Sequence, residues 1–267
     1  GDVCGWPGQR QVRLQGVGRE AGKTVRRTEK AGGFLCAVAG RGAGEAGEDQ
    51  RSGSDKADPV HAAKEYVKSF VGRSGQKCSS ARIAFVDSKI LPLFIMTAQE
   101  FLWEIRYGDV KNGADLGAVI THEDKQKLVG QVLDLTIDKL VQVFCEKKID
   151  YVSVNDFSPK ILKYTGSMDN EMALRRVMNT EFFGPVSTVV PFDNLDEVER
   201  GCKLSDFALT GSIFCRDTET LKRMVCVVPA GNLYWNRKCT GALVETECFG
   251  GLRSASSPNG IKGKNAL

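Results

Sequence analysis

The sequence predicts an α/β fold, a three-layer arrangement in which helices flank both faces of a parallel sheet. The strongest observation is that strand and helix patterns alternate in the last third of the chain, over residues 186–192, 195–204, 209–214, 218–227 and 231–235. Strands and helices that alternate at this spacing indicate right-handed βαβ crossovers. The second observation is composition: 42% of the 267 residues are hydrophobic and 26% are charged, as in chains that bury a sizeable core.

Composition changes near residue 57. Residues 1–57 hold 13 of the 29 glycines, and glycine makes regular structure costly in backbone entropy. We therefore expect residues 1–57 to be a loose segment with one buried strand at 34–39. Residues 58–267 are expected to form the α/β domain, which is truncated at both ends.

The middle of the chain alternates in the same way. Pro59 is suited to the first turn of a helix, and Thr121 followed by acidic residues is typical of a helix N-cap. Leu128, Val132 and Val143 are expected to face inward, with Leu135, along the helix that follows Thr121. The expected elements are a helix to residue 70, a loop at 72–78, a strand at 83–86, a helix at 93–105 and a helix from 122 to about 145.

Charge and residue counts exclude several classes of protein. The net charge of +4 comes from 37 basic and 33 acidic residues, which is too even for a nucleic-acid-binding surface. The chain has no apolar run of about 18 residues, so we expect no membrane span. Nine irregularly spaced cysteines and only two histidines argue for free thiols in a reducing compartment and against a structural metal site.

Cys78 is the candidate nucleophile. It follows Gly75-Gln-Lys77, so a cation adjoins it in a loop that can turn sharply. A neighbouring cation lowers the pKa of a thiol and raises the population of the reactive thiolate. The alternative is that Cys78, like most cysteines, is an inert packing residue.

Motifs in this order along the chain resemble the aldehyde dehydrogenase superfamily. The similarity covers about residues 58–263, and its 236–242 segment is most similar to the delta-1-pyrroline-5-carboxylate (glutamate semialdehyde) dehydrogenases. The motifs are the nucleophile loop at 75–79, the segment 109–120, Thr180-Glu-Phe-Phe-Gly-Pro-Val186, Leu209-Thr-Gly-Ser-Ile-Phe214 and the anchor region at 231–251.

The resemblance implies an enzyme of proline catabolism that oxidises glutamate γ-semialdehyde to glutamate with NAD. Cys78 would attack the aldehyde as a thiolate, a hydride would pass to the cofactor, and water would hydrolyse the resulting thioester. The matching general base is Glu45, which lies 33 residues (78 − 45) before Cys78. Glu48 and Asp49 replace the glycine and lysine of the family's motif, so an acidic solvated turn is the alternative.

The resemblance also implies binding residues. Glu181 would accept hydrogen bonds from the nicotinamide ribose hydroxyls and Phe183 would pack against the cofactor, although Phe183 could equally be a core residue. The positions that match substrate-binding residues are Ser79, Gly241, Ala242 and Phe249. No metal is implied, and the family's location is the bacterial cytoplasm or the mitochondrial matrix.

Two other functions remain open. Members of the family are roughly twice as long, so the chain could be a catalytically incomplete scaffold or subunit-interaction module. An exposed apolar face would then bind a partner or a second copy of the chain. The third alternative is a thiol-dependent esterase that uses Cys78 and Glu45 without a cofactor.

Overall fold

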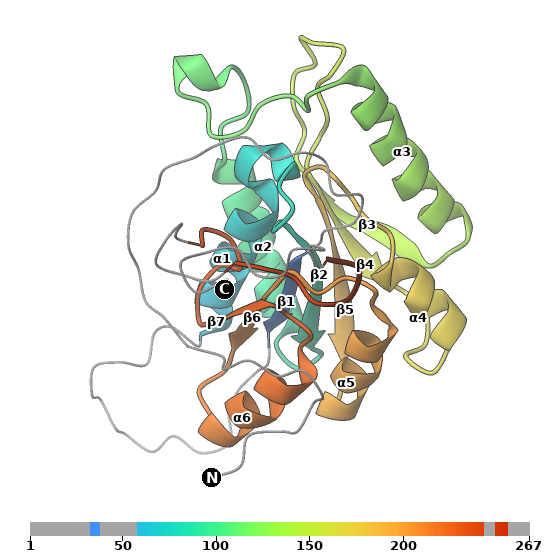
Figure 1. The fold of residues 1–267 in the computed structure, drawn as a ribbon. Helices are drawn as coiled ribbons and strands as arrows, with labels where there is room; N and C mark the ends of the chain where they lie inside the picture. Colours follow the sequence, from blue (N-terminus) through green and yellow to red (C-terminus); the bar gives the residue numbers. More distant parts are fainter. Residues whose placement is uncertain (1–32, 38–57, 243–248, 256–267) are drawn as a thin grey trace.

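The computed structural model describes residues 33–37, 58–242 and 249–255, the first of these as backbone only. This part of the chain forms a seven-stranded sheet with the order β3-β4-β5-β2-β1-β6-β7, in which only the edge strand β3 is antiparallel to its neighbour (Figure 1). The strands are β1 (Gly33–Ala37), β2 (Ala81–Asp87), β3 (Val141–Glu146), β4 (Lys160–Tyr164), β5 (Val186–Phe192), β6 (Thr210–Phe214) and β7 (Asn232–Trp235). The predicted α/β sheet is confirmed.

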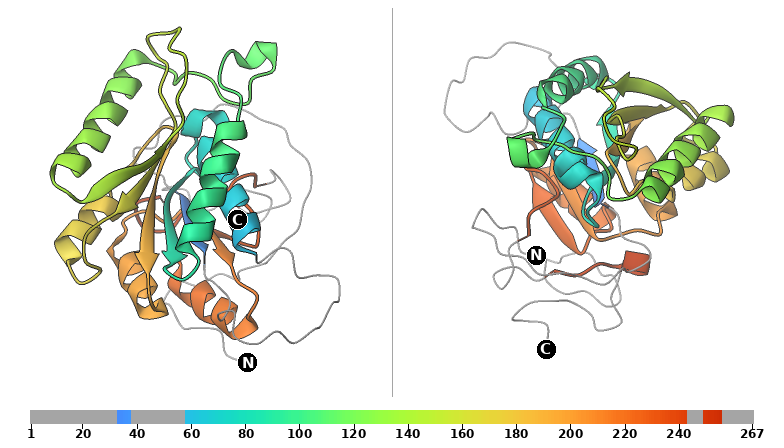
Figure 2. Two further views of the ribbon diagram at one scale, coloured as in Figure 1. Left: turned by 180° about the vertical axis from the view of Figure 1, so that it is seen from behind. Right: turned by 90° about the horizontal axis from the view of Figure 1, so that it is seen from above.

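Helices cover both faces of the sheet, which completes the three layers (Figure 2). The apolar side chains of α1 and α2 pack in one buried cluster, and those of α3 to α6 pack in a second cluster on the opposite face. The helices are α1 (Pro59–Val71), α2 (Leu91–Glu104), α3 (His122–Ile137), α4 (Glu171–Met178), α5 (Leu195–Leu204) and α6 (Thr218–Val227). None of these described helices is long and apolar enough to cross a membrane.

The helices begin where their capping residues place them. The Asp58 carboxylate accepts a hydrogen bond from Val60 N at 3.1 Å, and Pro59 occupies the first turn of α1. Thr121 Oγ1 accepts from Asp124 N at 3.0 Å at the start of α3. Both predicted helix starts are therefore confirmed, as are the predicted bounds of β5, α5 and α6.

Strand β1 confirms the expectation of a strand near residues 34–39. It lies between β2 and β6, pairs in parallel with both, and brings Gly33 opposite Ala81 and Thr210. The two halves of the sheet are hydrogen-bonded to each other through β1. A segment of the glycine-rich first 57 residues is thus an integral part of the sheet.

The predicted helix from 122 to about 145 is wrong in its last third. Helix α3 ends at Ile137, and Lys139 then adopts a left-handed conformation with φ of 55° that reverses the chain. Residues 141–146 form β3, in which Val143 is 42% exposed rather than inward. The apolar residues after 139 continue the helical pattern by coincidence, so periodicity alone missed the change to a strand. Strand β4 and helix α4 were also missed.

Two helical glycines provide a matched test of this packing. A Cβ at Gly201 in α5 would lie 2.5 Å from Phe85 Cζ in β2, whereas a Cβ at Gly130 in α3 would meet nothing within 4 Å. We expect Gly201→Ala to destabilise the fold by about 1–3 kcal/mol through overpacking. Gly130→Ala should stabilise it by up to about 1 kcal/mol through helix propensity. Urea denaturation measures both, and equal effects would contradict the packing of α5 on β2.

Candidate active site

The nucleophile loop joins α1 to β2 through a tight turn. Three consecutive residues, Arg73, Ser74 and Gly75, have positive φ angles of 55°, 56° and 67°. Ser74 Oγ donates a hydrogen bond to Gly117 O at 2.9 Å, which fixes the turn against the segment before α3. The chain therefore reverses sharply and delivers Cys78 to the amino end of β2.

A glycine-to-glycine contact places this loop on the segment before β5. A Cβ at Gly75 would overlap the carbonyl oxygen of Gly184, so the two backbones are in direct contact. On its other side Gly184 packs against Leu128 of α3, where a Cβ would also overlap. Only glycine fits at Gly75, whereas a side chain at position 184 would require Leu128 to move. The nucleophile loop, the 181–185 segment and α3 therefore form one packed unit.

The Gln76 side chain hydrogen-bonds the loop to the start of α3. Its side-chain oxygen accepts a hydrogen bond from Ile120 N at 2.8 Å, and its side-chain nitrogen donates to Asp124 Oδ2 at 3.3 Å. The sequence motif at 109–120 is thus adjacent to the motif at 75–79. The loop is thus fixed at Gln76, two residues before Cys78. It is also fixed at Ser79, whose carbonyl oxygen accepts two hydrogen bonds.

The chain after β7 returns to the same edge of the sheet. Asn236 turns it with a φ of 50°, and Cys239 Sγ then donates to Ser79 O at 3.4 Å. Thr210 Oγ1 donates to the same oxygen at 3.3 Å. Gly241 and Ala242 follow Cys239 closely in the chain, so the contact of Cys239 with Ser79 O holds their segment beside the nucleophile loop.

Among the residues that the structure describes, Cys78 is the exposed free thiol, and the free thiols of the other four cysteines are buried. The expectation of free thiols throughout is wrong at Cys226, which is disulfide-bonded.

The expected lowering of the Cys78 thiol pKa is not observed. Neighbouring atoms desolvate the sulfur and raise this pKa above its ordinary value, and the Glu181 carboxylate acts in the same direction. The Lys77 ammonium and the backbone N–H groups of Cys78 and Ser79 oppose them only in part. The thiol is accessible, but it is mostly protonated at neutral pH.

Glu181 and Phe183 lie in the segment between α4 and β5. Glu181 is half-buried, and its backbone oxygen accepts a hydrogen bond from Gln131 Nε2 of α3 at 2.9 Å. Phe182 is buried in the core, whereas the neighbouring Phe183 is half-buried and outside both core clusters. Phe182 therefore packs in the core, whereas Phe183 belongs to neither core cluster.

The remaining predicted residues are less closely gathered. Phe249 is half-buried, and the next residue, Gly250, donates its N–H to Asn232 Oδ1 at 3.3 Å. Phe249 is thus at the amino end of β7, on the edge that carries Cys78, with β1 and β6 between them. Ser79 is buried and is held by its carbonyl oxygen. Glu45 lies outside the described residues.

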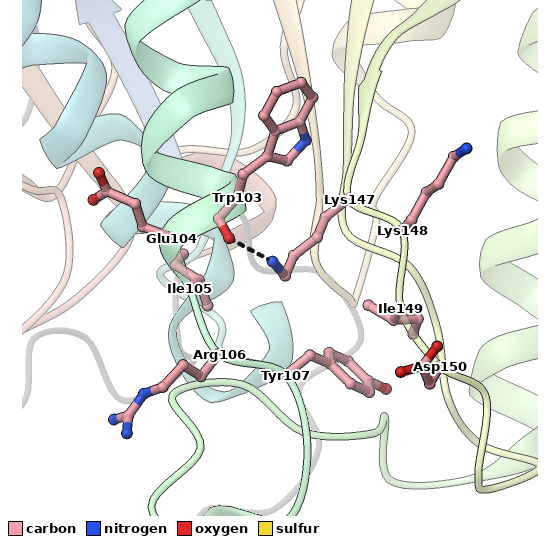
Figure 3. A pocket seen from close by; sticks show the side chains of 9 residues that line it. All are labelled: Trp103, Glu104, Ile105, Arg106, Tyr107, Lys147, Lys148, Ile149 and Asp150. Atoms are coloured by element: carbon pink, nitrogen blue, oxygen red, sulfur yellow. Dashed lines mark hydrogen bonds between the residues drawn. The ribbon is translucent and has the colours of Figure 1, made fainter.

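One described hollow, of about 430 Å³, contains none of the predicted site residues (Figure 3). It lies between the end of α2 and the chain after β3, where Lys147 Nζ donates to Trp103 O at 2.7 Å. A second hollow of about 240 Å³ is lined by Glu181 together with Gln131 and Arg176. In the described part of the chain no group of three or more His, Cys, Asp or Glu side chains could hold a metal.

The sequence of the chain is similar to those of known proteins. The sequence pattern of the Aldehyde dehydrogenase family matches residues 47–266. The chain is 29% identical over 218 residues to 1-pyrroline-5-carboxylate dehydrogenase from Staphylococcus haemolyticus, covering 79% of this chain and 40% of that protein. The chain thus spans less than half the length of this relative.

Solved structures share the fold. Proline utilization A from Bdellovibrio bacteriovorus has a TM-score of 0.67 and 27% identity, over 77% of this chain and 20% of that one. The 1-pyrroline-5-carboxylate dehydrogenase from Thermus with bound NAD has a TM-score of 0.70 and 23% identity, over 87% and 40%. At that identity, the second likeness shows the fold alone.

The thiol environments predict selective modification. In the native protein iodoacetamide should alkylate Cys78 well before the buried thiols, of which Cys202 and Cys239 have pKa values raised by burial to about 12 and about 11. The Cys78 rate should still rise with pH above neutrality because its own pKa is raised. Peptide mapping after timed alkylation measures this, and a rate already at its plateau at pH 7 would contradict it.

The contact between Gly75 and Gly184 predicts a second effect. Gly75→Ala should destabilise the fold by about 2–4 kcal/mol, since it adds a backbone overlap at a left-handed position. Gly72→Ala in the same loop is the control, because its Cβ would meet nothing within 4 Å and its φ is −52°. That variant should stay within about 0.5 kcal/mol of wild type in urea denaturation.

Proposed function

Because the chain belongs to the aldehyde dehydrogenase family, we propose that it provides the cysteine-bearing part of an enzyme that oxidises L-glutamate γ-semialdehyde to glutamate with NAD. The observation that carries the proposal is the exposed Cys78 thiol, held by the Gly75–Gly184 contact beside the segment with Glu181 and Phe183. The names of the relatives and their place in proline catabolism support the choice of substrate.

In this proposal Cys78 is the nucleophile. Its thiol loses a proton, and the sulfur adds to the aldehyde carbon to form a thiohemiacetal whose oxygen carries the negative charge. A nicotinamide cofactor, when bound, supplies the acceptor for the hydride of that carbon. Water then cleaves the thioester, which releases the carboxylic acid and returns Cys78 to its thiol form. Glu45 is the proposed base for that water.

The described residues fit the nicotinamide end of such a cofactor. Glu181 offers a half-buried carboxylate, the acceptor that two adjacent ribose hydroxyls require. Phe183 offers a ring that the core does not use. The backbone contact between Gly75 and Gly184 holds the segment with Glu181 and Phe183 beside the nucleophile loop. We propose that Glu181 and Phe183 bind and orient the cofactor there.

The anchor region supports an anionic substrate. Gly241 has a φ of 92°, and a Cβ there would lie 3.7 Å from the Arg237 guanidinium and 3.8 Å from Lys238 Cε. Arg237 stacks on the ring of Tyr234 at 4.5 Å, which restricts its position. We propose that the N–H groups of Gly241 and Ala242 bind the substrate's α-carboxylate beside these cations, with Ser79 and Phe249 lining the site.

A second function is favoured by other observations. The raised pKa of Cys78 works against catalysis, and α2 exposes Leu93, Met96 and Trp103, the last two to 54% each. A scaffold or subunit-interaction module that no longer turns over substrate would show these features.

One assay separates the two functions. Purified chain is mixed with pyrroline-5-carboxylate and NAD, and NADH formation is followed for wild type and Cys78→Ser. The enzyme proposal predicts a rate that falls by at least about 10³-fold in Cys78→Ser, since the nucleophile is lost.

The control is Cys145→Ser, which removes a buried thiol in the edge strand β3 and should retain the wild-type rate. No NADH from a wild-type chain that melts cooperatively, with a melting temperature unmoved by NAD, would reject the enzyme proposal and support the module.

A further inference from the structure

Arg82 is the largest fully buried side chain in the described part of the chain, with 2% of its surface exposed. It lies in β2, four residues after Cys78. Its guanidinium donates hydrogen bonds to Met178 O and to Ser205 Oγ, and it stacks on the ring of Phe207 at 3.7 Å. A cation buried this deeply destabilises the fold unless nearby carboxylates compensate its charge.

Two carboxylates provide that compensation. Burial lowers the pKa of Arg82 to about 9, while the Glu181 and Asp206 carboxylates raise it, so the group is cationic at pH 7. Each acidic residue follows closely on a residue that accepts a hydrogen bond from the guanidinium. Met178 is three positions before Glu181, and Ser205 directly precedes Asp206.

The backbone before Glu181 is held on both sides. Arg82 binds the carbonyl of Met178 at the end of α4, and Gln131 Nε2 binds the carbonyl of Glu181 itself at 2.9 Å. Asn179 Nδ2 donates to Leu204 O at 2.8 Å, and Asp206 N donates to Asn179 Oδ1 at 2.7 Å. The Glu181 segment is thus attached to α3, to β2 and to the end of α5.

We propose that Arg82 is a positioning residue for Glu181: its buried guanidinium holds the segment that carries this carboxylate and offsets the negative charge that the carboxylate presents to Cys78. This inference rests on the proposed roles of Cys78 and Glu181. It adds a residue that the motifs did not single out, and it couples the two proposed functional groups through the interior of the domain.

The proposal has a defined electrostatic consequence. Among the described residues, Lys77 and Glu181 act on the Cys78 sulfur through their charges, and Glu181 and Asp206 act on the Arg82 guanidinium. Neutralising position 82 leaves the negative charge of Glu181 uncompensated. The thiolate of Cys78 then becomes less stable, so its pKa rises.

The test is the pH profile of Cys78 alkylation by iodoacetamide in the 267-residue chain, which requires neither cofactor nor substrate. Arg82→Met should raise the apparent thiol pKa by about half a unit. At a fixed pH below the pKa, the alkylation rate should therefore be about threefold lower. Glu181→Gln should lower the thiol pKa. In the Arg82→Met/Glu181→Gln double variant the profile should match Glu181→Gln alone, because Arg82 acts through Glu181.

The control is Arg200→Met, which removes a surface cation that pairs with Asp169 on the outside of α5 and should leave the profile unchanged. Arg82→Gln is a second neutral variant whose amide can still donate to Met178 O, and it should give the same rise. A profile unchanged in both neutral variants overturns the proposal, as does a rise that persists with Glu181→Gln. If neither neutral variant folds, Arg82 is a structural residue alone and the proposal is equally overturned.

The outcome is independent of the proposed enzymatic activity. A chain that shows the coupling but makes no NADH would support the role of Arg82 and contradict the proposed dehydrogenase. A chain that makes NADH but shows no coupling would support the proposed dehydrogenase and contradict the role of Arg82.

Discussion

The backbone contact between Gly75 and Gly184 is the constraint on which the candidate site depends. The two residues are 109 positions apart (184 − 75), and neither could carry a side chain without overlap with backbone or with Leu128. Because the contact is between main chains, it fixes the spacing of two loops more strictly than a contact between flexible side chains would. Cys78 follows one of these glycines by three residues, and Glu181 precedes the other by three. The geometry of the thiol and the carboxylate is therefore set by the fold rather than by the two side chains.

Support for this geometry comes from the middle of the sheet. Strand β1 hydrogen-bonds β2 to β6, so it holds the strand that begins after Cys78 beside the strand whose Thr210 binds Ser79 O. The buried Arg82 then links β2 to the ends of α4 and α5. The hydrogen bonds of the sheet and the contacts of the buried Arg82 thus both hold the loops at the amino ends of the strands in place.

Sequence patterns predicted the elements whose signals are local. Asn194 and Asp217 cap α5 and α6, and the bounds of both helices follow from those caps and from helical periodicity. The end of α3 was missed because the left-handed turn at Lys139 has no glycine to mark it. Motif resemblance singled out Cys78 and Glu181 as candidates. It did not predict the sign of the thiol pKa shift, which depends on desolvation and on a carboxylate 103 residues away (181 − 78). Arg82 was missed, although a charged residue within the apolar run of β2 is itself a signal.

The state of Cys78 follows from a balance between neighbours, and that balance can shift. Desolvation and Glu181 disfavour the thiolate, while Lys77 and two backbone N–H groups favour it. Hydrogen-bond donors that bind the Glu181 carboxylate draw its charge toward themselves and weaken its effect on the sulfur. Occupation of Glu181 by hydroxyl groups would therefore lower the thiol pKa and increase the thiolate population.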